Sequence, residues 1–122
     1  MVFLTRYDHL LRVAARLGKV KAGSFLADVT IHEVLSLAGP VLAYTKDEAA
    51  ARTLLPPDFE WMHITPTAGW IYAPCRLTGA NQDGMAYPHH GQWCRTIPLS
   101  LCGGVLRAWA MLARLEEKHP YQ

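Results

Sequence analysis

Residues 59–73 read FEWMHITPTAGWIYA, and this stretch decides the fold because it has the pattern of two strands joined by a turn. Aromatic and β-branched side chains, which favour half-buried pleated strands, dominate residues 59–65 and 70–73. The intervening segment, Pro-Thr-Ala-Gly at 66–69, is typical of a turn. We therefore predict an antiparallel pair of strands at the centre of the chain.

The strand pattern continues beyond this pair. The second strand extends irregularly past Pro74 towards Leu77, and proline inside a strand indicates a sheet edge or a bulge. Residues 78–91 are rich in Gly, Asn, Asp, Pro and His, so we expect an exposed loop there, and whether it covers a site is left open. Residues 92–96 predict a third strand, which completes a small antiparallel meander of about three strands.

Helical patterns flank this meander on both sides. We expect helices over about 5–17, from Ser24 to Gly39-Pro40, from Thr45 to Leu55, and from Pro98 to about Glu117. Thr5 with Asp8, and Thr45 with Glu48, have the spacing of an N-cap and its acidic partner. The order is three helices, three strands and one helix. It predicts an α+β fold with a small antiparallel sheet sandwiched by helices.

Composition limits the class of protein. The chain has 122 residues, 51% of them hydrophobic and 18% charged, which suits one globular domain over residues 1–122. Acidic and basic residues nearly balance, and a net charge of +2 is too small for a protein that binds duplex DNA mainly through charge. No apolar run is long enough for a membrane span. Three cysteines and an N-terminal segment without signal-peptide features lead us to expect a cytoplasmic protein with reduced thiols.

Catalytic and metal motifs are missing from the sequence. It contains no CxxC, HExxH, GxSxG or dinucleotide-binding fingerprint, so we predict no metal, no cofactor and no enzyme activity. His89 and His90 are adjacent, and neighbouring side chains on an extended chain point in opposite directions, which is unsuited to joint metal binding. A Cys–His nucleophile pair stays open at this level.

Several motifs together resemble a family of small phage proteins, the phage ABA sandwich domain. The matching stretches are 39–45 and 47–50, LLPPDFEW at 54–61, TIPLSLC at 96–102, and 105–108, with 24–35 matching less closely. They cover most of the chain from Ser24 onward. The resemblance implies a helix–sheet–helix sandwich. This chain departs from the family in its extra first helix and in the 78–91 loop.

One group with this domain is similar to the Thoeris anti-defence sponges, phage proteins that sequester signals of the cyclic ADP-ribose type. Some of them also bind cyclic oligonucleotides. The resemblance implies a phage or prophage protein of the host cytoplasm, a homo-oligomer that holds a nucleotide second messenger without cleaving it. The messenger and the subunit number stay open.

Such a ligand needs flat surfaces for its base and cationic donors for its phosphates. Trp61, Trp70, Tyr72 and Trp93 lie in the strand region and could stack on a base, and Trp70 and Tyr72 share a strand face. Each of these rings could instead be an ordinary core or interface side chain.

Arginine supplies eight of the twelve basic residues, and its planar guanidinium suits phosphate. Arg95 is our first choice for a ligand contact, because it immediately precedes the last helix, where Thr96, Ser100 and the free amides could form an anion cradle. Arg76 is a second phosphate candidate. Arg107 shares a helix face with Gly103 and Arg114, and the Gly103-Gly104 pair indicates close packing, for which we expect a partner subunit.

Two other functions remain open alongside the sponge. Exposed aromatic and arginine side chains also dominate protein interfaces, so an inhibitor acting on a protein, in the manner of an anti-CRISPR or another anti-defence factor, fits the same composition. An enzyme that cleaves the signal is the third possibility, and no convincing nucleophile or acid–base pair supports it.

Overall fold

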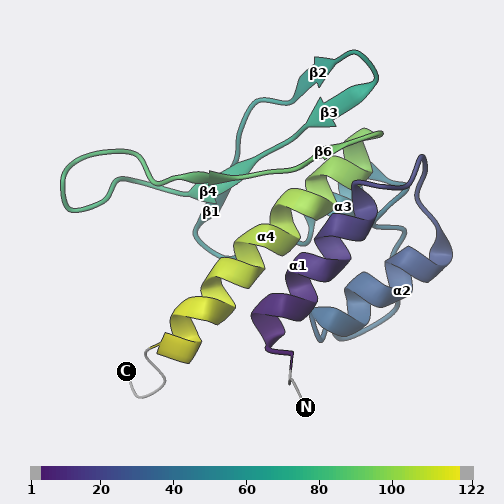
Figure 1. Ribbon diagram of the computed structural model, residues 1–122, viewed down its shortest axis with the longest axis horizontal. Helices are drawn as coiled ribbons and strands as arrows, with labels where there is room; N and C mark the ends of the chain where they lie inside the picture. Colours follow the sequence, from purple (N-terminus) through teal and green to yellow (C-terminus); the bar gives the residue numbers. More distant parts are fainter. Residues whose placement is uncertain (1–3, 119–122) are drawn as a thin grey trace.

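Three extended segments form the strand layer of the molecule. The computed structural model describes residues 4–118, and Figure 1 shows this layer above the helices. Each segment is broken near its middle: the first into β1 (Phe59–Trp61) and β2 (Thr65–Thr67), the second into β3 (Trp70–Tyr72) and β4 (Cys75–Leu77), the third into β5 (His89–His90) and β6 (Trp93–Cys94). The strand orders are β1-β4-β5 and β2-β3-β6, antiparallel throughout. The predicted three-strand meander is confirmed, as two small sheets.

The break between the two sheets is stabilised by a buried serine. Ser100, from α4 (Ile97–Lys118), accepts a hydrogen bond from Ala73 N–H at 2.9 Å and donates one to Gln92 O at 2.7 Å. These are backbone groups of the central and third segments that the ladders leave unpaired at the break. Pro74 follows Ala73 and has no N–H to donate. The sequence predicted a sheet edge or a bulge at Pro74. The edge is wrong, because β3 and β4 are each the central strand of their sheet, and the irregularity is a break between these two strands.

The prediction of a continuous loop over residues 78–91 is wrong at its end. His89 and His90 form β5, which pairs with β4 in the register Arg76↔His89 and Cys75↔His90. A strand of two histidines has no alternating apolar pattern, so only its partner identifies it. The rest of the segment is a loop, which projects away from the helices in Figure 1 and is closed by Asn81 Oδ1, acceptor for the Asp83 and Met85 amides.

The helices lie against one side of the strands, and α4 packs against β3, β4, β5 and β6. Figure 1 shows α1 (Arg6–Leu17) alongside α4, with α2 (Phe25–Val34) beyond it. The expected range of the last helix is confirmed, and Leu101 and Val105 of its predicted apolar face are buried. The α+β class, with a small antiparallel sheet packed on helices, is also confirmed. Among the described residues, none of the helices has the length and hydropathy required to cross a bilayer.

The ends of the shorter helices correct two predictions. The capping box of Thr5 and Asp8 is present at α1, and α2 begins at the expected place, with Ser24 as its N-cap. However, α2 ends at Val34, well before Gly39, because the chain turns into the left-handed region at Ser36 (φ 55°). Helix α3 (Glu48–Arg52) is capped by Asp47, whose side chain accepts from Ala50 N–H, and not by Thr45.

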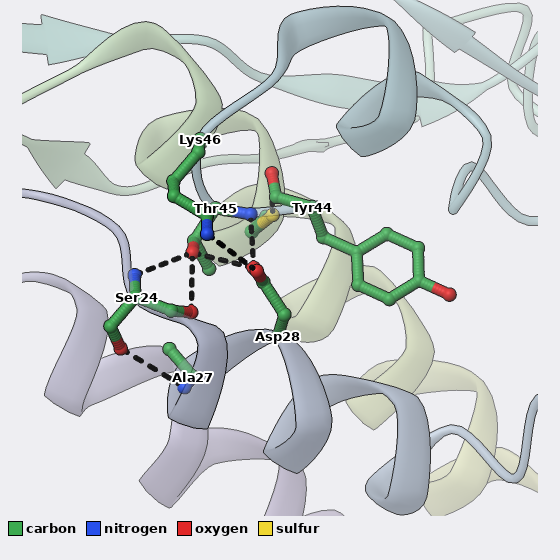
Figure 2. Close-up of polar contacts among 7 residues, drawn as sticks. Ser24, Ala27, Asp28, Tyr44, Thr45 and Lys46 are labelled. Atoms are coloured by element: carbon green, nitrogen blue, oxygen red, sulfur yellow. Dashed lines mark hydrogen bonds and ion pairs between the residues drawn. The ribbon is translucent and has the colours of Figure 1, made fainter. Parts of the chain in front are cut away.

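Thr45 does not cap α3 because a buried carboxylate from α2 binds it. Asp28, which is 1% exposed, accepts hydrogen bonds from Thr45 N–H at 2.8 Å and Thr45 Oγ–H at 2.6 Å (Figure 2). Thr45 Oγ1 accepts in turn from Ser24 N–H at 3.0 Å, and Lys46 Nζ lies 3.7 Å from Asp28 Oδ2. We call Ser24, Asp28, Thr45 and Lys46 the clasp. It joins the start of α2 to the segment that leads into α3.

Candidate functional site

Four of the predicted ligand-binding residues lie together at β3 and β6. Cys94 is buried toward α4 and pairs with Ile71. Successive side chains of a strand point to opposite faces, so the neighbours of this pair, Trp70, Tyr72 and Trp93, lie on the face turned away from α4. The Tyr72 and Trp93 rings are 5.1 Å apart between centroids, tilted by 35°. The guanidinium carbon of Arg95 lies 3.8 Å from the centroid of the Trp70 ring. We call Trp70, Tyr72, Trp93 and Arg95 the aromatic row.

The aromatic row borders a shallow depression. A volume of about 460 Å³ is lined by Trp70, Trp93, Thr67, Ala68 and Gly18, the last at the end of α1. Arg95 already covers part of the Trp70 ring, whereas Trp93 is 44% exposed. Trp93 is therefore the ring most available for stacking on a planar ligand. Trp61, the fourth predicted ring, lies elsewhere, with Arg52 5.5 Å from its centroid.

The predicted anion cradle at the start of α4 has most of its donors already engaged. Thr96 Oγ1 accepts from Leu99 N–H at 3.3 Å, so Thr96 caps the helix. Pro98 has no N–H, and the Ser100 hydroxyl holds the break between the sheets. Arg95 points to Trp70. The helix start therefore offers a ligand much less than the sequence suggested.

Arg76 lies near the aromatic row but is paired with a carboxylate. Its Nε donates to Glu60 Oε1 at 3.1 Å, across the β1–β4 ladder. Both residues line a depression of about 560 Å³ that also includes His63, Tyr72 and His89. Because Glu60 neutralises the guanidinium and would repel an anion, this depression is a poor phosphate site.

Arg107 lies in a second cationic region, on the other side of the edge strands. This region is a depression of about 390 Å³, which we call the edge cleft. Two helices and the strand edge line it. The lining residues are Tyr7 and Leu11 of α1, Arg107, Met111 and Arg114 of α4, and Tyr72, His89, His90 and Gly91 of the strand layer. Tyr72 thus belongs to both the aromatic row and the edge cleft. The sequence placed Arg107 and Arg114 on one helix face, but it gave no sign that Tyr7 lies beside them.

Arg107 is positioned by a buried glutamine. Gln92, 9% exposed, accepts from Arg107 Nε at 3.0 Å through Oε1 and donates to the Ala14 carbonyl of α1 through Nε2. Arg114 is positioned differently, with its guanidinium carbon 4.9 Å from the centroid of the Tyr7 ring. Both guanidinium groups are therefore held by neutral partners.

The Gly103-Gly104 pair is explained within the chain, because both glycines are buried against it, so their presence does not require the expected subunit contact. A Cβ at Gly103 would lie 2.9 Å from Gln92 Nε2, and one at Gly104 would lie 3.1 Å from the carbonyl oxygens of Ala73 and His90. Contacts this short are essentially absent from folded proteins or force the neighbour to shift. The glycines let α4 approach the strands closely enough for Gln92 to bridge α1 and α4.

Within residues 4–118, the cysteines and histidines give no sign of a reactive or metal-binding centre. Burial raises the pKa of the Cys75 thiol to about 12 and also raises the pKa of Cys94 and Cys102, which disfavours the thiolate that a nucleophile needs. The His89 ring lies near Tyr72 and the His90 ring near Phe59, so the two point apart. Across residues 4–118, no three His, Cys, Asp or Glu side chains come together as a metal site would require.

Comparison of the chain with protein-family models, with curated proteins and with solved structures finds no match.

Proposed function

We propose that this protein binds a nucleotide second messenger and sequesters it without cleaving it, as a phage or prophage anti-defence protein. The observation that carries the proposal is the aromatic row, in which two tryptophans, a tyrosine and an arginine gather on the strand face turned away from α4. Base stacking on an aromatic ring contributes about 1–3 kcal/mol per base and tolerates different bases. The half-exposed Trp93 beside its depression supports such a contact.

Sequestration requires affinity but no chemical step. Among the described residues, the thiols are buried with raised pKa values, and Glu60 is paired with Arg76. A binding protein of this kind reaches high affinity mainly through slow dissociation. As the resemblance implies, we also expect a homo-oligomer, which light scattering of the purified protein would detect as a mass above 13.6 kDa.

The direct test is recovery of the ligand. The protein is incubated with cyclic ADP-ribose isomers and with cyclic di- and trinucleotides, separated from free ligand, and then heated. Chromatography of the released material distinguishes the three functions. Intact ligand supports sequestration, and degraded ligand indicates an enzyme. A protein that retains none of these ligands would contradict the proposal.

One observation favours the second candidate function, inhibition through a protein interface. Phe25 and Leu26, at the start of α2, are 68% and 76% exposed, an unusual pair of large apolar side chains at the surface. Neither residue lines the depression beside the aromatic row. A Phe25→Glu/Leu26→Glu variant that keeps ligand binding but loses anti-defence activity would support this second function, whereas a Trp93→Ala variant with the opposite pattern would support sequestration.

A further inference from the structure

We infer that the edge cleft binds the diphosphate group of the ligand, an inference that rests on the proposed function. The sequence placed the phosphates at Arg95 and Arg76, but Arg95 stacks on Trp70 and Arg76 pairs with Glu60. The edge cleft adjoins the aromatic row through Tyr72, which lines the cleft and lies 5.1 Å from Trp93 between ring centroids. A base on Trp93 would thus direct its phosphates toward Arg107 and Arg114.

The first argument is charge. Within the described part of the chain, the ion pairs are Lys46–Asp28, Arg52–Glu48 and Arg76–Glu60. Arg107 and Arg114 are held instead by an amide and by an aromatic ring. Their positive charges therefore remain uncompensated by a carboxylate, and no Asp or Glu is among the residues described as lining the cleft. Such a site favours anions.

The second argument is geometry. Arg107 and Arg114 are seven residues apart on α4, about 10.5 Å along the helix axis, and both line the same cleft. Because Gln92 occupies Nε of Arg107, the two terminal nitrogens are the donors left for a ligand. Two forked donors about two helical turns apart suit an elongated diphosphate better than a single phosphate. Tyr7 and the His89–His90 segment also line the cleft.

The third argument concerns how Tyr72 reaches both surfaces. The ring lies directly over Gly91, where a Cβ would be 2.6 Å from the ring carbon that bears the hydroxyl. Any side chain at this position would displace the ring. Glycine at position 91 thus allows the Tyr72 ring to lie over the backbone between β5 and β6, where it contacts both His89 and Trp93. The two surfaces are joined by a specific arrangement of side chains.

The test is calorimetric titration of the full chain with inorganic pyrophosphate and with orthophosphate. We expect pyrophosphate to bind at least tenfold more tightly than orthophosphate. Arg107→Gln and Arg114→Gln should each weaken pyrophosphate binding at least tenfold, whereas Arg52→Gln, which removes the same charge elsewhere, should change it less than twofold. Thermal unfolding of each variant verifies that it is folded, and Arg114→Gln serves as the exposed, structurally mild case if Arg107→Gln is unstable.

Three outcomes would overturn the inference: no pyrophosphate binding by the unmodified protein, equal binding of the two anions, or equal losses in Arg114→Gln and Arg52→Gln. The proposed function fails separately. If the nucleotides bind and pyrophosphate does not, the diphosphate assignment is wrong while sequestration stands. If pyrophosphate binds and no nucleotide is retained, the cleft is an anion site and the proposed function is wrong.

Discussion

The clasp and the edge cleft are both polar clusters that join distant segments. The charge in the clasp is paired within the chain, whereas the charges in the edge cleft are not. In the clasp, Asp28 is almost fully buried, and the chain itself supplies its donors from Thr45 and its cation from Lys46. In the edge cleft, Arg107 and Arg114 are oriented by Gln92 and Tyr7 without being neutralised. A cluster whose hydrogen bonds and charge are all satisfied internally stabilises the fold. One that is oriented but left charged at the surface is suited to a ligand.

Breaking the clasp should produce the largest change in stability. Asp28→Ala leaves the Thr45 amide and hydroxyl without their buried acceptor, and we expect a loss of about 3 kcal/mol in the free energy of unfolding. Urea denaturation measures this loss. Pyrophosphate affinity of the folded fraction should be unchanged. A loss below about 0.5 kcal/mol would show that the clasp is not a structural element.

Disturbing the support of the edge cleft should have an intermediate effect on stability and a clear effect on binding. Gly103→Ala places a Cβ against the buried Gln92 side chain, which we expect to cost about 1–2 kcal/mol after the gain in helix propensity. When Gln92 is displaced, Arg107 loses the hydrogen bond that orients it, so pyrophosphate binding should weaken. Ala108→Gly is a control that also alters the helix but not this contact. Normal binding by Gly103→Ala would exclude the positioning role of Gln92.

Acidification should lower the stability of the fold through His90, one of the residues that line the edge cleft. Burial, and to a smaller extent the neighbouring His89, lowers the pKa of His90 below its usual 6.5. The unfolded chain therefore binds a proton at higher pH than the folded chain does, and this histidine makes stability fall as the pH drops from 7 through 6.5 toward the folded pKa. We expect His90→Gln to flatten the decline between pH 7 and 5.5 in thermal unfolding. An identical decline in the variant would contradict this assignment.

The smallest stability effect is expected at the exposed cation of the cleft. Arg114→Gln removes a surface guanidinium that contacts Tyr7, so the free energy of unfolding should change by less than about 0.5 kcal/mol. Together with the expected loss of pyrophosphate binding, this is the reverse of the result for Asp28→Ala. A large destabilisation by Arg114→Gln would place Arg114 among the structural residues and remove the contrast between the two regions.

The sequence predicted features that depend on local spacing. The period of two put Trp70 and Tyr72 on one face, the cap at Thr5 is present, and the second helix starts at Ser24 as expected. The prediction failed where a distant group competes. Thr45 has the spacing of a cap, yet Asp28, seventeen residues earlier, binds it. No local pattern could reveal that competition.

The candidate site follows the same rule. Alternation along one strand indicated that Trp70 and Tyr72 share a face, whereas Trp93 joins them through the pairing of β3 with β6, which alternation does not give. The edge cleft depends on α1 and α4 packing together, with Gln92 contacting Ala14 and Arg107 at once. That bridge joins residues 78 positions apart in the chain. Arg107 was therefore predicted as a candidate, whereas Tyr7 and the neutral support of both arginines could not be.

The central claim is that one ligand is held by rings at one end and by uncompensated guanidinium groups at the other. Its most direct test is calorimetric titration of Trp93→Ala and Arg114→Gln with both cyclic ADP-ribose and inorganic pyrophosphate. We predict that each variant binds cyclic ADP-ribose at least tenfold more weakly, while only Arg114→Gln loses affinity for pyrophosphate. Cyclic ADP-ribose affinities within threefold of the unmodified protein in both variants would contradict the claim.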